Sequence, residues 1–302
     1  MIDFLKYHGA GNDFVILDQR RQTLSEPLGE LSVQLCHRRF GVGADGILVV
    51  RDTDVQGAQA AMHIYNSDGS VAEMCGNGLR CVVKYLLDEA PDQENITVAT
   101  GAGPLQCVVQ RDVHGRVQRV RVDMGKPILD RAAIPISGEG RAVREGITHP
   151  EGGRFLFTGV SLGNPHAVIF ADSGEPVSLA RRFGPSLEAH PRFPKRANIS
   201  FVRQHETHLE AAVWERGAGL TAACGTGACA IGVAAVLEER VRSGEAVTVS
   251  LPGGELEIEV AQGMERVFMT GPASLVFSGR LDPASLMSIE RCQRLSEVMG
   301  AS

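Results

Sequence analysis

The chain lacks the features that would suit it to a membrane, a nucleic acid or secretion. No apolar run approaches the roughly 18 residues that a membrane-spanning helix needs. The N-terminus MIDFLKYHGAG does not have the charged-then-apolar layout of a signal peptide. The net charge is only −6 over 302 residues and is spread along the chain. We therefore expect a cytoplasmic protein that binds neither nucleic acid nor membrane.

Patterns typical of disulfides and metal sites are also missing. The seven cysteines are an odd number without regular spacing, which favours free thiols in a reducing compartment. No Cys-x-x-Cys occurs, and the nine histidines have no spacing typical of a ligand set. We expect no metal site.

Two of the cysteines lie in nearly identical glycine-rich settings, Cys75 in MCGNGLRC and Cys224 in ACGTGACA. Their offset is 224 − 75 = 149, and the same offset aligns Asn66 with Glu215 without a gap. This similarity is the first sign of an internal duplication.

Two further pairs of similar segments follow in the same order along the chain. GNDFVIL (11–17) resembles GNPHAVIF (163–170), and ITVATGAGPLQCVV (96–109) resembles VTVSLPGGELEIEV (247–260), with offsets of 152 and 151. Three such pairs at a nearly constant offset indicate a repeat of the whole domain, and 302 residues suffice for two domains of roughly 150 residues. We expect an N-terminal repeat over 1–124 plus 280–302, and a C-terminal repeat over 125–279.

The periodicity predicts many short strands and few helices. The strands are expected at 46–50, 60–65, 105–109, 116–124, 166–170, 199–203, 208–214 and 256–260. An apolar stripe from Leu79 to Leu87 predicts one helix, small apolar residues over 227–237 predict a second, and 283–299 predicts a third. The expected fold is α/β (α+β), with two pseudo-symmetric domains. In each domain a mostly antiparallel strand layer wraps around a central helix, and the active site lies in the cleft between them.

Each of the two cysteines stands immediately before one of the expected central helices. Unpaired N–H groups and a partial positive charge at a helix N-terminus favour a thiolate there. Gly76 and Asn77, and likewise Gly225 and Thr226, can bring backbone amides close to a carboxylate. The sequence therefore predicts two anion cradles, each with a thiol beside it.

A pair of thiols on opposite faces of one carbon can invert its configuration. One cysteine as thiolate removes the α-proton, while the other, as thiol, returns a proton to the opposite face. Negative charge that builds up on the carboxylate is stabilised by the N–H donors. Such a reaction requires no cofactor, and we expect none.

The motifs resemble those of the diaminopimelate epimerase family, within the cofactor-independent amino-acid racemases. The matching segments are HGAGNDFVILD (8–18), GVGADGI (41–47), YNSDGS (65–70), MCGNGLRC (74–81), GNPHAV (163–168), RFPKRANISFV (192–202), WERGAGLTAACGTGACA (214–230), LPGGELEI (251–258) and MTGPASLVFSG (269–279). The resemblance implies interconversion of LL- and meso-2,6-diaminopimelate, a step toward lysine and peptidoglycan. It also implies a homodimer.

The resemblance assigns roles to individual residues. Cys75 and Cys224 match the acid/base pair, while His166 and Glu215 match residues that assist the thiols or the substrate ammonium group. The residues that match substrate-binding positions are Asn12, Asn66, Gly76, Asn77, Asn164, Asn198, Arg216, Gly225 and Thr226. Among them, Arg216 suits a distal carboxylate because its planar fork can donate two hydrogen bonds.

Three positions depart from the family pattern. Gly46 stands where some members carry a glutamine that contacts substrate, and Leu220 stands where glutamate is common. Phe277 replaces a tyrosine that is often found near the dimer contact.

Two other functions remain open at this level. A racemase of proline, hydroxyproline or histidine could use the same fold, although Arg216 and the asparagines favour a substrate with a second polar end. A cysteine hydrolase or transferase would use a single thiol with His166, and only one of the two cysteines would then be essential.

Overall fold

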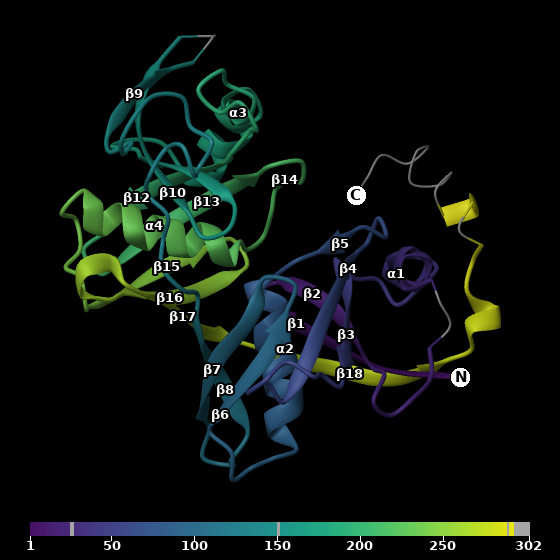
Figure 1. The fold of residues 1–302 in the computed structure, drawn as a ribbon. Helices are drawn as coiled ribbons and strands as arrows, with labels where there is room; N and C mark the ends of the chain where they lie inside the picture. The colour runs from purple at the N-terminus through teal and green to yellow at the C-terminus, as the bar shows by residue number, and fades with distance from the viewer. Residues whose placement is uncertain (25–26, 150–151, 289, 293–302) are drawn as a thin grey trace. The chain divides into compact units, whose positions relative to one another are not determined.

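The computed structural model describes residues 1–24, 27–149, 152–288 and 290–292, and the chain divides into two compact units (Figure 1). Unit 1 combines Met1–Val120 with the segment that begins at Pro272, and unit 2 is Arg121–Gly271. The chain therefore leaves unit 1, completes unit 2 and returns.

Unit 1 is built on a curved sheet. Its strands are β1 (Ile2–Gly9), β2 (Asn12–Asp18), β3 (Gly46–Arg51), β4 (Ala60–Asn66), β5 (Val71–Ala72), β6 (Asn95–Thr100), β7 (Gly103–Arg111), β18 (Ser274–Leu281) and β8 (Val117–Asp123), which continues into unit 2. The pairing order is β18-β1-β2-β3-β4-β6-β7, with β5 also on β4. In this order, the pairs β2–β3 and β4–β6 are parallel and the other pairs are antiparallel.

Unit 2 repeats this plan strand for strand. Its strands are β9 (Glu145–Thr148), β10 (Arg154–Ser161), β11 (Pro165–Phe170), β12 (Asn198–Gln204), β13 (His208–Glu215), β14 (Gly219–Leu220), β15 (Ala246–Leu251), β16 (Gly254–Val260) and β17 (Val267–Pro272). The order is β9-β10-β11-β12-β13-β15-β16-β17, with β14 on β13, and again two pairs are parallel, β11–β12 and β13–β15. The predicted α/β class, dominated by antiparallel strands, is confirmed.

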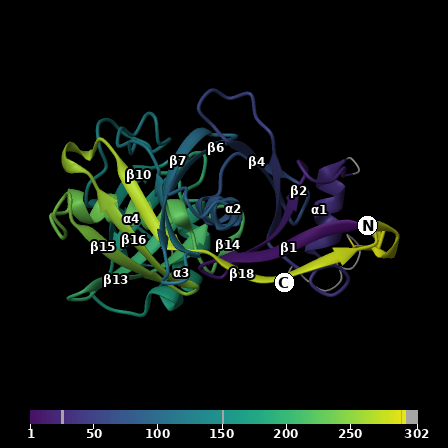
Figure 2. The same ribbon diagram turned by 90° about the horizontal axis from the view of Figure 1, so that it is seen from below.

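A helix lies inside the curve of strands in each unit. In unit 1, α2 (Gly76–Asp88) packs against β1, β2, β3, β4, β6 and β18, and Figure 2 shows it surrounded by these strands. In unit 2, α4 (Gly225–Leu237) packs against β10, β11, β12, β15 and β16. Both helices were predicted, and their burial explains why α4 is apolar on every side.

Glycine allows each central helix to approach its sheet closely. A Cβ atom at Gly78 would lie 2.9 Å from Leu48 Cδ2, and one at the equivalent Gly227 would lie 3.1 Å from Val213 Cγ2. A larger side chain at either position would push the helix away from the strands.

Two helices on the outer faces of the sheets were not predicted. In unit 1, α1 (Leu28–Cys36) packs on β3 and β4; in unit 2, α3 (Pro176–Glu188) packs on β12, β13 and β14. The start of α3 did carry a signal, since the Glu175 carboxylate accepts hydrogen bonds from the backbone N–H groups of Val177 and Ser178.

The remaining elements are two short 3₁₀ turns, η1 (Gln262–Met264) and η2 (Pro283–Ser285). Of the helix predicted over 283–299, residues 283–285 form the turn η2, residues 290–292 are helical, and residues 289 and 293–299 lie outside the described residues. No helix among the described residues is long and apolar enough to cross a membrane.

Candidate active site: two half-sites

The first half-site is at the start of α2, where Cys75 is the N-cap residue. Its backbone is extended, with φ −142° and ψ 114°, and its carbonyl accepts the first helical hydrogen bond, from Leu79 N at 2.8 Å. The half-buried thiol points to the start of β2, where it donates to Asn12 Oδ1 at 3.7 Å. The helix start thus holds the sulfur where backbone N–H groups are available.

Two asparagine side chains beside Cys75 are linked to each other. Asn77 Nδ2 donates to Asn12 Oδ1 at 3.2 Å. On either side of this pair, Arg80 Nη2 donates to Asn77 Oδ1 at 2.9 Å, and Asn12 Nδ2 donates to Asp45 Oδ2 at 2.6 Å. The structure therefore brings together the predicted residues Asn12, Cys75 and Asn77, and adds Asp45 and Arg80, which the sequence analysis did not identify.

A cluster of charges supports this half-site at the surface. Arg38 donates to both oxygens of Asp13 and to Asp45, and Lys6 also pairs with Asp13. Burial by itself would raise the pKa of the Asp13 carboxyl, but the hydrogen bonds from Arg38 and Lys6 outweigh it and hold that pKa far below its ordinary value. Asp13 is therefore a fixed negative charge at neutral pH.

Asn66 lies at the end of β4, opposite Gly46 on β3. Its Nδ2 donates to Ser70 Oγ at 2.9 Å, and its backbone carbonyl accepts from Ser32 Oγ at 2.7 Å. A Cβ at Gly46 would lie 2.7 Å from the carbonyl oxygen of Tyr65, so a longer residue there would require the backbone to shift. This close approach accounts for the glycine at position 46, where some members of the family have glutamine.

The second half-site starts α4 in the same way, with Cys224 as N-cap residue and its carbonyl accepting from Ala228 N at 2.9 Å. Here the thiol is buried, and its sulfur lies 3.6 Å from Thr226 Oγ1. Burial raises the pKa of Cys224 well above its ordinary value, and the nearby Glu215 carboxylate raises it further. Cys224 is therefore a thiol at neutral pH in this state of the protein.

His166 is fully buried behind Thr226. Its Nε2 lies 3.0 Å from Asn164 Oδ1 and 3.1 Å from Thr226 Oγ1. Burial lowers the pKa of His166 to about 3, with a smaller contribution from the Arg216 cation. The imidazole is therefore neutral, and it contacts the residue beside the cysteine rather than the sulfur itself.

Asn198 is hydrogen-bonded to both β11 and the residue after β13 in the second half-site. Its Nδ2 donates to the Pro165 carbonyl at 3.0 Å and its Oδ1 accepts from Arg216 N at 2.8 Å. The Glu215 carboxylate accepts from Thr221 Oγ1, and Arg216 Nη1 donates to the Lys195 carbonyl at 3.1 Å. These contacts fix the β13–β14 turn that carries Glu215 and Arg216.

Strand register makes the two half-sites equivalent. Phe14 is paired with Gly46 in unit 1 as His166 is paired with Asn198 in unit 2, so Asn12 corresponds to Asn164. The helix starts correspond in the same way, Gly76 with Gly225 and Asn77 with Thr226. Each unit therefore presents one cysteine, one cradle and one asparagine in the same topological position.

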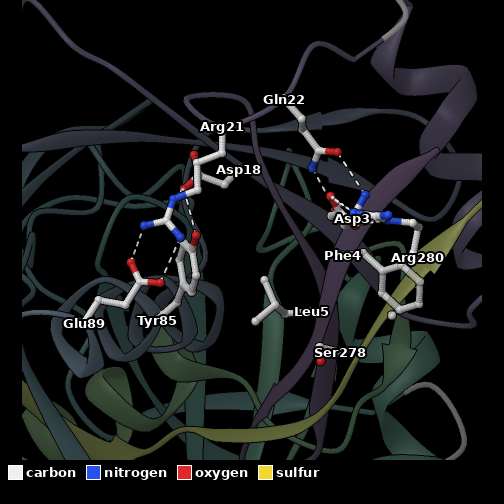
Figure 3. Close-up of a pocket in the computed structure, with 11 residues that line it drawn as sticks. Asp3, Phe4, Leu5, Asp18, Arg21, Gln22, Tyr85, Glu89, Ser278 and Arg280 are labelled. Carbon is white, nitrogen blue, oxygen red and sulfur yellow. Dashed lines mark hydrogen bonds and ion pairs between the residues drawn. The ribbon is translucent and has the colours of Figure 1, made fainter.

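A separate pocket in unit 1 is shown in Figure 3. It has a volume of about 610 Å³ and lies at the far end of α2, lined by Tyr85 and Glu89, about 15 Å along the helix from Cys75 at 1.5 Å per residue. Arg21 pairs with Glu89, Arg280 pairs with Asp3, and Tyr85 donates to Asp18. These charged and polar groups are already paired with one another, so the pocket does not present a reactive group comparable to the cysteines of the half-sites.

All seven cysteines are free thiols. Within the described ranges, no group of three or more His, Cys, Asp or Glu side chains is arranged to hold a metal ion.

Comparisons with known proteins match most of the chain. The family model for diaminopimelate epimerase matches residues 4–129 and 158–276. The chain is 46% identical over 285 residues to a diaminopimelate epimerase of Desulfitobacterium hafniense, which covers 93% of this chain and 98% of the relative. It is 41% identical over 284 residues to that of Leptospira biflexa, with 93% and 99% covered.

Solved structures with the same fold are more distant in sequence. A hydroxyproline epimerase from Agrobacterium vitis superposes with a TM-score of 0.69 at 16% identity, covering 94% of this chain and 93% of that one. A predicted epimerase from Pseudomonas aeruginosa gives 0.65 at 13% identity, with 93% and 99% covered. At these identities the likeness shows the fold alone. The family model and the close relatives show more: this chain belongs to the diaminopimelate epimerase family.

Proposed function

We propose that the protein is a diaminopimelate epimerase that interconverts LL- and meso-2,6-diaminopimelate, an isomerase step of lysine and peptidoglycan precursor synthesis. The observation that carries the proposal is the duplicated half-site, in which Cys75 and Cys224 each cap the start of a buried helix at equivalent positions. Close relatives that share 41–46% of their residues with this chain carry the same activity in their names.

In the proposed reaction, each unit is one copy of an epimerase repeat and both half-sites act on one substrate. The substrate carboxylate is held by backbone N–H groups of both helix starts, at Gly76 and Asn77 and at Gly225 and Thr226. One cysteine as thiolate takes the α-proton, and the other, as thiol, donates its proton to the opposite face of the carbanion. The thiol and thiolate have then exchanged roles. One proton is taken up and one is given, so the reaction consumes no cofactor.

The polar residues divide the remaining tasks. We assign Asn12, Asn66, Asn164 and Asn198 to the substrate's polar groups, and Arg216 to its distal carboxylate, for which it retains donors beyond the one used on the Lys195 carbonyl. Glu215 is assigned to the substrate ammonium group and to Cys224, whose pKa it raises. His166 is neutral and buried, so its assistance consists of holding Thr226.

The geometry disfavours a cysteine hydrolase. Such an enzyme requires a histidine that takes the proton of the nucleophilic thiol. His166 has its pKa lowered to about 3, and its Nε2 contacts Asn164 and Thr226. A histidine in this environment is a poor base at neutral pH.

The assignment is tested by incubating the protein with LL-diaminopimelate and following the meso isomer by NMR. We expect conversion in both directions, since an epimerase catalyses approach to equilibrium from either isomer. L-Proline, trans-4-hydroxy-L-proline and L-histidine serve as parallel substrates. Turnover of one of these, with none of LL-diaminopimelate, would transfer the assignment to another racemase of this fold.

We also propose that the protein is a homodimer. Support comes from β18, where Leu275, Val276 and Phe277 are each about half exposed, an unusual density of apolar surface on one strand. Light scattering of the wild type and of Val276→Asp decides this, with a dimer expected for the first and a monomer for the second. A monomeric wild type would contradict the proposal.

The cytoplasmic location stays a prediction, which cell fractionation can check.

A further inference from the structure

The hydrogen bonds beside Cys75 form a chain with a single direction. Arg80 donates to Asn77, Asn77 donates to Asn12, and Asn12 donates to Asp45, over donor–acceptor distances of 2.9, 3.2 and 2.6 Å. An asparagine amide can usually turn by 180° and exchange its donor for its acceptor. In this row of hydrogen bonds, each end opposes such a turn of the asparagine amides.

At one end, a guanidinium can only donate hydrogen bonds, and Arg80 is fully buried. Asn77 must therefore turn Oδ1 to Arg80 and Nδ2 to Asn12. Arg80 is held in place by two further hydrogen bonds, to the carbonyls of Gly76 at 3.3 Å and Pro272 at 3.1 Å.

At the other end, a carboxylate can only accept. Asp45 accepts from Asn12 Nδ2, from the backbone N–H of Asp13 at 3.0 Å, and from Arg38 at 2.8 Å. Asn12 must therefore turn Nδ2 outward to Asp45, which leaves Oδ1 facing Asn77 and the sulfur of Cys75.

We propose that Asp45 is a positioning residue of the first half-site: with Arg80 as the buried anchor, it locks Asn12 so that a carbonyl oxygen faces Cys75. A carbonyl oxygen accepts a hydrogen bond from the thiol and repels the thiolate, so the lock favours protonated Cys75. In unit 2 the residues equivalent to Asp45 and Arg80 are Ala197 and Cys229, which supply neither a carboxylate nor a guanidinium.

Other groups also influence the ionisation of Cys75. The charged and titratable side chains on the surrounding elements include Lys6 and His8 on β1, Asp13 on β2, Arg38 and Asp45 between α1 and β3, Glu73 after β5, and Arg80 and Cys81 on α2. Burial raises the pKa of Cys81 to about 12, so it does not titrate in the working range. A test must therefore separate the effect of the Asn12 amide orientation on the Cys75 thiol from the effect of the negative charge of Asp45.

The variant Asp45→Asn makes this separation possible. An amide at position 45 can donate as well as accept, so the outer end no longer forbids Asn12 from turning Nδ2 toward the sulfur, and only the Asn77 amide still opposes that turn. The side chain of Asp45 is 42% exposed, so the replacement leaves the core intact. Glu73→Gln is the matched control, because it removes an exposed carboxylate two residues before Cys75 without touching Asn12.

The measurement is the pH profile of iodoacetamide alkylation at Cys75, resolved by peptide mass spectrometry. Cys75 is the half-buried cysteine of the chain and the other six are buried, so it is the reactive one. We expect Asp45→Asn to lower the midpoint of the profile by about one pH unit, a tenfold change in thiolate at fixed pH. Glu73→Gln should lower it by much less.

A double-mutant cycle completes the test. In an Asn12→Ala background there is no amide to orient, so the shift caused by Asp45→Asn should shrink to that of Glu73→Gln. Equal shifts for the two single variants, or an undiminished Asp45→Asn shift in the Asn12→Ala background, would overturn the proposal. The inference rests on the proposed function for the identity of the site residues. Because alkylation needs no substrate, failure to epimerise LL-diaminopimelate and failure of the lock are distinguishable.

Discussion

Cys75 and Cys224 begin equivalent helices, yet their surroundings differ. Cys75 is half-buried beside two amides that are tied to a charged surface cluster, whereas Cys224 is buried beside a hydroxyl and a carboxylate. At the position where unit 1 has Phe14, unit 2 has the buried His166. The matching strand plan of the two units therefore fixes where each sulfur lies, and the neighbouring side chains decide how readily it ionises.

The largest effect that should distinguish the two units is acid sensitivity of unit 2. Folded His166 has a pKa of about 3, below the unfolded value of about 6.5, so between these values only the unfolded chain binds the proton. Its contribution to stability is therefore complete above pH 6.5 and is lost as the pH falls toward 3. At pH 5 the loss should be about 2 kcal/mol relative to pH 7.5 (1.5 pH units at 1.36 kcal/mol each).

Urea unfolding of wild type and His166→Gln at pH 7.5 and pH 5 checks this. The variant should lose about 2 kcal/mol less than the wild type on acidification. His208→Gln, on β13 of the same unit, is the control and should behave as the wild type. Parallel losses in wild type and His166→Gln would show that His166 is protonated in the folded protein.

A smaller effect is expected at Glu215, which corresponds to Asn66 of unit 1. Glu215→Gln replaces the carboxylate with an amide of the kind that unit 1 already has, and this removes one of the causes that raise the pKa of Cys224. Alkylation of Cys224 at pH 8 should then accelerate by about tenfold, equivalent to one pKa unit. Glu210→Gln, on the same strand, should leave the rate unchanged. An unchanged or slower rate in Glu215→Gln would mean that burial alone suppresses the thiolate.

Much of this comparison could be predicted from the sequence. The glycine-rich segments after Cys75 and Cys224 precede recognisable apolar helices, so both N-cap positions followed from local pattern. The repeat offset then paired Asn66 with Glu215 correctly, as the strand register confirms.

What could not be predicted depends on contacts between distant segments. Asp45 lies 30 residues before Cys75, and the register of β2 with β3 brings it to Asn12. The burial of Arg80 is equally invisible locally, because an arginine on a helix is ordinarily exposed. Likewise, α1 was missed because it has only nine residues, and α3 because Gly184 and Pro185 inside it are ordinarily helix breakers.

The claim on which all of this depends is that both sulfurs act on one α-carbon. The most direct measurement follows LL-diaminopimelate in deuterated water by NMR, with wild type, Cys75→Ser and Cys224→Ser. The account predicts that wild type forms meso product carrying one α-deuterium from solvent. Each serine variant should lose inversion by a factor of about 10² to 10⁴, the usual contribution of an acid/base group. Inversion at the wild-type rate in either variant would contradict the account, because one thiol would then suffice.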